Sequence, residues 1–77
     1  MDLDNLIVMA NRIGSFFVAL PDRDEALAGI AEHVKKFWEP RMRAQILAAV
    51  GTEAGAEMSE IVSAALTTHR AMLQPTA

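Results

Sequence analysis

Cysteine is absent from this sequence, and histidine occurs only at His33 and His69. A chain without cysteine can form neither a disulfide bond nor a thiolate metal site. Two histidines far apart in the chain also do not supply the closely spaced ligand sets that zinc requires. We therefore expect this chain to bind no metal, and the lack of disulfides is compatible with a reducing compartment.

Basic residues and long apolar runs are scarce as well. Seven Lys and Arg against ten Asp and Glu give a net charge of −3, whereas a nucleic-acid-binding protein needs an excess of basic side chains along one face. No apolar run approaches the roughly 20 residues that span a bilayer. The N-terminal Met-Asp-Leu-Asp is acidic where a secretion signal would be basic. These features predict a cytoplasmic protein without nucleic-acid or membrane partners.

What the chain does contain is apolar residues at helical spacing. Ala, Leu, Ile, Val and Met supply most of the 52% apolar content, and no segment alternates with the period of a strand. We predict an all-α fold, a small bundle of four helices in one domain, residues 1–77. The expected helices cover about 3–19, 22–38, 40–50 and 58–73, with a mobile loop at 51–57.

Local signals place the ends of these helices. Asp22 followed three residues later by Glu25 resembles a capping box, and Pro40 suits the first turn of a helix. Gly51 and Gly55 lie in the polar loop, and Ser59 is a candidate N-cap for the last helix. On the second helix the expected buried face is Leu27, Ile30, Ala31, Val34, Phe37 and Trp38.

Catalytic motifs are missing. The four glycines match neither the P-loop nor the dinucleotide-binding pattern, and Ser59 and Ser63 have ordinary explanations as a cap and a helix-surface residue. We therefore expect that the chain is not an enzyme.

The most pointed local feature is a basic corner at the Glu39-Pro40 junction, formed by Lys35, Lys36, Arg41 and Arg43. Together with His33 it is a candidate site for an anionic ligand or for the carboxylates of a protein partner, because guanidinium groups bind such oxygens bidentately. Alternatively, the lysines only complement the negative end of the second helix. Arg43 falls within an apolar arc, where a charged group requires a partner.

Several apolar side chains are candidates for a protein interface. Met9 and Phe16 widen the apolar arc of the first helix beyond what a small bundle readily buries, so they either face another protein or are buried beneath the last helix. Trp38 is the only tryptophan, and His69 lies within the apolar stripe of the last helix, so each is either a core or an interface residue. The candidate interface is Met9, Phe16, Phe17, Trp38, Glu39, Pro40, Arg41, Arg43 and His69.

Ordered motifs extend over nearly the whole chain. They are Met9-Ala-Asn-Arg-Ile-Gly-Ser-Phe-Phe17, Pro21-Asp-Arg-Asp-Glu-Ala-Leu27, Ile30-Ala with His33, Phe37-Trp-Glu-Pro-Arg-Met-Arg43, and Ile61-Val with Ala65-Leu and His69-Arg70. Together these segments resemble the delta subunit of cytosolic NAD-dependent formate dehydrogenases. The string at 37–43 is the most specific, while Glu60 after Ser59 departs from the proline usual in that family.

This resemblance implies a bacterial complex whose large catalytic (alpha) subunit carries a molybdenum-pterin cofactor, with iron-sulfur clusters and flavin in other partner subunits. The delta subunit would bind none of these cofactors. It would bind the catalytic subunit and support assembly, stability or cofactor insertion, and it could self-associate when isolated. The alternative is a maturation factor that receives a nucleotide or pterin phosphate on the basic corner.

Overall fold

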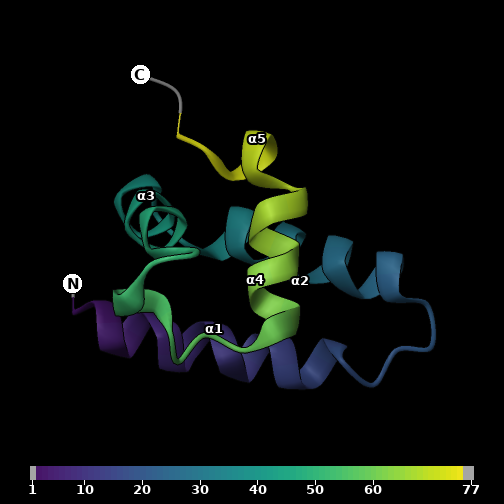
Figure 1. The fold of residues 1–77 in the computed structure, drawn as a ribbon. Coiled ribbons are helices and arrows are strands. Elements are labelled where there is room, and N and C mark those ends of the chain that lie inside the picture. The colour runs from purple at the N-terminus through teal and green to yellow at the C-terminus, as the bar shows by residue number, and fades with distance from the viewer. Residues whose placement is uncertain (1, 76–77) are drawn as a thin grey trace.

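The computed structural model describes residues 2–75, and all regular structure within them is helical (Figure 1). The predicted all-α class is confirmed. The helices are α1 (Leu3–Phe17), α2 (Arg23–Phe37), α3 (Pro40–Ala49), the short 3-10 helix η1 (Glu53–Gly55), α4 (Glu60–Thr68) and α5 (Arg70–Leu73).

The helices α1 and α2 run in opposite directions, and α4 crosses in front of them in the view of Figure 1. The helix α3 lies to the left and is seen nearly end-on, while α5 lies at the upper end of α4. This arrangement places α5 near the junction of α2 and α3. The contacts that hold it there are described below.

Acidic side chains begin the first two helices. The Oδ1 atom of Asp2 accepts a hydrogen bond from the Asp4 amide at 3.1 Å. The Oδ1 atom of Asp22 accepts from the amides of Asp24 (3.0 Å) and Glu25 (3.3 Å). These bonds satisfy donors that have no partner in the first turn of a helix, and the negative charge favours that end of the dipole.

The last helix differs from the expected single span of 58–73. It begins at Glu60, and it is interrupted at His69, which ends α4 and precedes α5 with φ −109° and ψ 25°. The break lets α5 approach α3, where Arg70 Nη2 donates to the Leu47 carbonyl at 3.1 Å. Ser59 occupies the N-cap position, but its side chain makes no capping bond.

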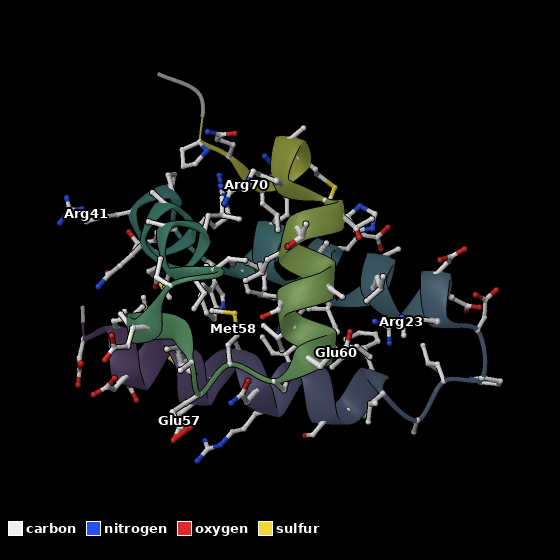
Figure 2. The ribbon with its side chains drawn as sticks, viewed as in Figure 1. Arg23, Arg41, Glu57, Met58, Glu60 and Arg70 are labelled. Atoms are coloured by element: carbon white, nitrogen blue, oxygen red, sulfur yellow. The ribbon has the colours of Figure 1, made fainter. Side chains whose placement is uncertain are left out.

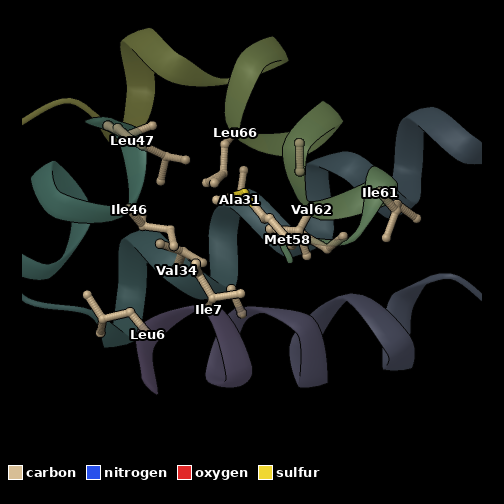
Figure 3. Packing of buried hydrophobic residues seen from close by; sticks show 14 of the residues in the cluster. Leu6, Ile7, Ala31, Val34, Ile46, Leu47, Met58, Ile61, Val62 and Leu66 are labelled. Atoms are coloured by element: carbon tan, nitrogen blue, oxygen red, sulfur yellow. The ribbon is translucent and has the colours of Figure 1, made fainter. Parts of the chain in front are cut away.

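The core lies between the helices and contains side chains from all five α-helices (Figure 3). The largest fully buried side chains are Leu6, Ile30, Val34, Ile46, Val62, Leu66 and Leu73. Burial of one such side chain contributes about 1.5–3 kcal/mol. The presence of Leu73 among them shows that the short α5 belongs to the core.

The segment 51–57 is packed against the end of α3. Gly51 has a positive φ of 77°, which ends the helix in a conformation that L side chains rarely adopt. Both the amide (3.1 Å) and the hydroxyl (2.7 Å) of Thr52 donate to the Ala49 carbonyl. Gly55 is buried, and a Cβ there would collide with the same carbonyl. The mobility expected for this loop stays a prediction.

A single side chain ties the following turn to α1. Asn11 Nδ2 donates to the Glu57 carbonyl, and Asn11 Oδ1 accepts from the Ser59 amide, both at 2.9 Å. One amide side chain therefore satisfies two backbone groups of the turn that leads into α4.

Arg43, the charged residue within an apolar arc, finds its partners on the backbone. It is 8% exposed, its Nε donates to the Leu73 carbonyl at 3.0 Å, and its Nη1 donates to the Trp38 carbonyl at 2.9 Å. A longer contact of 3.5 Å joins Nη1 to the Lys35 carbonyl. These oxygens lie at the C-terminal ends of α5 and α2, which have unpaired carbonyls and a partial negative charge.

We expect Arg43→Met to lower the free energy of unfolding by about 2–3 kcal/mol, because it leaves buried carbonyls without donors. Urea denaturation followed by the fluorescence of Trp38, the only tryptophan, measures this loss. Arg41→Met is the matched control, since Arg41 is exposed and points away from the chain (Figure 2). Equal stability of the two variants would contradict a structural role for Arg43.

Gly14 sets the distance between α1 and α4, since a Cβ there would lie 2.7 Å from Val62 Cγ2. We expect Gly14→Ala to lower the free energy of unfolding by about 1 kcal/mol, because overpacking costs about 1–3 kcal/mol and exceeds the helix-propensity gain of about 1 kcal/mol. In a Val62→Ala background, where the colliding methyl is gone, the same substitution should no longer destabilise. A double-mutant cycle tests this coupling.

Candidate interaction surface

The described residues offer no metal site and no membrane span. Within residues 2–75 there is no group of three or more His, Cys, Asp or Glu side chains that could hold a metal ion. None of the helices in this range combines the length and apolar character that crossing a bilayer requires. The notable surface features are therefore exposed apolar and basic side chains.

An aromatic face, formed by Ile13, Phe16, Phe17, His33 and Phe37, extends over the C-terminal half of α1 and along α2. Phe16 is 77% exposed and Phe37 is 64% exposed. Ile13, Phe16, Phe17 and His33 line a hollow of about 270 Å³. Two phenylalanine side chains and the apolar hollow beside them are therefore in contact with water, which is unfavourable. A protein partner that covered them would remove this contact.

Glycine at position 29 shapes the hollow. The Phe17 ring lies directly over Gly29, in the space that a Cβ would occupy. Phe16 packs edge-on against Phe17, with ring centroids 5.5 Å apart and planes at 85°. His33 and Phe37 follow Gly29 at intervals of four residues, so the three positions form one stripe along α2. The His33 and Phe37 rings are 4.7 Å apart.

Phe16 and the core contacts of α1 lie on different sides of that helix. Gly14 contacts α4 through Val62, whereas Phe16, two residues later, projects about 160° away around the helix axis. Packing of α4 therefore leaves Phe16 uncovered, whereas Ile13 and Phe17 pack partly against the core.

Two of the predicted interface residues, Trp38 and Arg43, lie inside the chain. Trp38 is 5% exposed, while Phe37, which we expected on the buried face, is exposed. The helix α2 ends at Phe37, and Trp38 adopts an extended backbone (φ −98°, ψ 138°). The helical spacing that assigned both rings to one face therefore stops between them.

The other predicted interface residues are accessible to different degrees. Phe16, Glu39, Pro40 and Arg41 are exposed, and Met9, Phe17 and His69 are half-buried. The Met9 sulfur accepts a weak hydrogen bond from Asn5 Nδ2 at 3.9 Å. His69 lies at the break between α4 and α5, distant in sequence from the aromatic face.

The basic corner retains three exposed cations, Lys35, Lys36 and Arg41. His33, the fifth candidate of the anion site, instead contributes to the aromatic face. Lys36 Nζ lies 5.6 Å from the centroid of the Phe37 ring, within the range of a cation–π contact. Among residues 2–75 the only ion pair joins Arg23 to Glu60 (Figure 2), so the three cations have no carboxylate partner there.

The Arg23–Glu60 pair links the starts of α2 and α4 at the surface. The hydrogen bond that Arg23 donates to Glu60, together with the negative charge of Glu60, raises the pKa of Arg23. Both side chains are more than half exposed, and exposed pairs are screened by solvent, so the pair contributes little to stability.

Sequence reasoning did not place Ile13, His33 or Phe37 at the interface, and it gave no role to Gly29 beneath the Phe17 ring. The signal was present in the interval of four residues from Gly29 to His33 and again to Phe37. Such a stripe, however, does not reveal whether a neighbouring helix covers it.

The sequence was also compared with known protein families, curated proteins and solved structures. Searches of curated proteins and of solved structures gave no match. The model of the family described as the NADH-dependent formate dehydrogenase delta subunit FdsD matches residues 5–66, which include α2, α3, η1 and most of α1 and α4. The matched range contains the entire aromatic face and the basic corner, and the chain belongs to the family of NADH-dependent formate dehydrogenase delta subunits.

Proposed function

We propose that this delta subunit is not itself catalytic and binds the molybdenum-containing catalytic subunit through its aromatic face. The observation that carries this proposal is the exposure of Phe16 and Phe37 beside an apolar hollow. Aromatic side chains are enriched at the centres of protein interfaces, where they supply large apolar areas. In a chain of 77 residues, such exposure is costly unless a partner covers it.

The consequence of this binding would be support for assembly, stability or cofactor insertion in the cytoplasm. The absence of cysteine in the chain and of a metal-binding group among the described residues supports a division in which other subunits carry molybdenum-pterin, iron-sulfur clusters and flavin. Binding to the folded subunit stabilises it by mass action. When the partner is missing, the same face would favour self-association of the isolated chain.

The alternative function, a maturation factor that holds an anionic nucleotide or pterin phosphate on the basic corner, has less support. Arg43 donates to backbone carbonyls, which leaves Lys35, Lys36 and Arg41 for a ligand. Because Lys36 lies beside the exposed Phe37 ring, a protein surface with both apolar and acidic groups fits this region better than a phosphate alone.

We expect Phe16→Ala and Phe37→Ala each to weaken binding to the purified catalytic subunit by about 30-fold, the equivalent of roughly 2 kcal/mol for an aromatic interface residue. Biolayer interferometry with the full chain measures this change. Val8→Ala is the matched control, because Val8 is 48% exposed on α1 but lies outside the aromatic face.

Circular dichroism checks that the three variants fold and melt like the native chain. Loss of binding in the Val8 variant alone, or equal binding by all variants, would place the contact surface elsewhere.

A further inference from the structure

The aromatic face has a charge at one end. Lys36 lies beside Phe37 in the last turn of α2, and His33, which lines the hollow, is three residues earlier on the same helix. At 1.5 Å per residue, Lys36 and His33 are separated by about 4.5 Å along the helix axis. An apolar hollow and a cation are therefore adjacent on one surface.

From this juxtaposition we propose that the aromatic face receives a segment of the catalytic subunit with a defined pattern. A large apolar side chain of that segment enters the hollow, and a carboxylate within a few residues of it pairs with Lys36. The inference rests on the proposed function and deepens it, since it names the chemistry of the partner.

The size of the hollow fits a side chain. Its volume of about 270 Å³ lies below the range of about 300–1,000 Å³ typical of small-molecule sites. Its lining is apolar apart from the His33 ring, so it offers few polar groups to orient a small ligand. One large aliphatic or aromatic side chain would fill much of it and displace water from Phe16 and Phe17.

Lys36 is available for a carboxylate from outside the chain. Glu32 precedes it by four residues, the usual spacing for a helical ion pair, yet the two are not paired within the described part of the chain. The apolar groups of a docked segment would exclude water around the Lys36 ammonium, and a carboxylate would then compensate for its lost hydration. The partner is therefore acidic as well as apolar at this point.

A second copy of the chain is a poorer occupant of this face. In a two-fold contact the same patch lies on both sides of the interface. The residues of the aromatic face include no carboxylate, so a two-fold contact centred on that face would bring together two Lys36 side chains, and any acid would have to come from outside the face, as Glu32 would. The charge favours a partner of different sequence.

Cross-linking identifies the occupant directly. Phe16→p-benzoylphenylalanine in the full chain, bound to the catalytic subunit and irradiated, should give cross-links to a peptide that carries a large apolar residue close to Asp or Glu. Val8→p-benzoylphenylalanine is the positional control and should give little of that product. Cross-links from position 16 to the delta chain itself, or to a peptide without Asp or Glu, would overturn the proposal.

Charge reversal tests the role of Lys36 separately. Lys36→Glu should weaken binding to the catalytic subunit about tenfold, since it removes one attraction and adds a repulsion. Lys35→Glu is the matched control, because it changes the same charge in the same helical turn about 100° around the axis. Added salt should weaken the binding of the native chain and of the Lys35 variant, but it should not weaken the binding of the Lys36 variant, because salt screens the new repulsion.

The outcomes separate this inference from the proposed function. If Phe16→Ala and Phe37→Ala weaken binding while Lys36→Glu and Lys35→Glu have the same affinity for the catalytic subunit, the aromatic face remains the docking surface. The inference that the bound segment carries a carboxylate next to Lys36 is then wrong. If none of the four variants changes the affinity, the proposed function of the face fails together with the inference.

Discussion

The guanidinium group of Arg43 joins the C-terminal ends of two helices, and the rest of the arrangement depends on that contact. Its Nε and Nη1 atoms donate to the carbonyls of Leu73 and Trp38, which have no helical partner. The positive charge also complements the negative ends of α2 and α5. In a chain with no cysteine, this buried cation holds the C-terminal turn to the middle of the chain, as a disulfide does in other small domains.

The elements that depend on local chemistry could be predicted from the sequence. The acidic caps at Asp2 and Asp22 and the proline in the first turn of α3 act within three residues of their own position. The partners of Arg43 could not be predicted, although its place in an apolar arc showed that partners must exist. Its acceptor on Leu73 is 30 residues away in the chain, and only the packing of α5 brings it close.

The candidate interaction surface could also be predicted only in part. The wide apolar arc of α1 indicated that Phe16 would be left uncovered, as it is. The assignments failed where the helical period ends, at Phe37 and Trp38, because one extended residue is enough to reverse which ring faces the core. Helical periodicity predicts the direction of side chains in the middle of a helix. In this chain Phe37, Trp38 and the carbonyls that Arg43 binds lie at helix ends, where tertiary packing decides which groups face the core.

The shape of the aromatic face depends on Gly29, which lies underneath the Phe17 ring. The Phe17 ring occupies the volume that any larger residue at position 29 would need, so the depth of the hollow depends on the absence of a side chain. A substitution there would push the ring outward and reshape the surface without touching a partner residue. A substitution at a position that the partner does not touch would therefore change which partner surfaces this subunit fits.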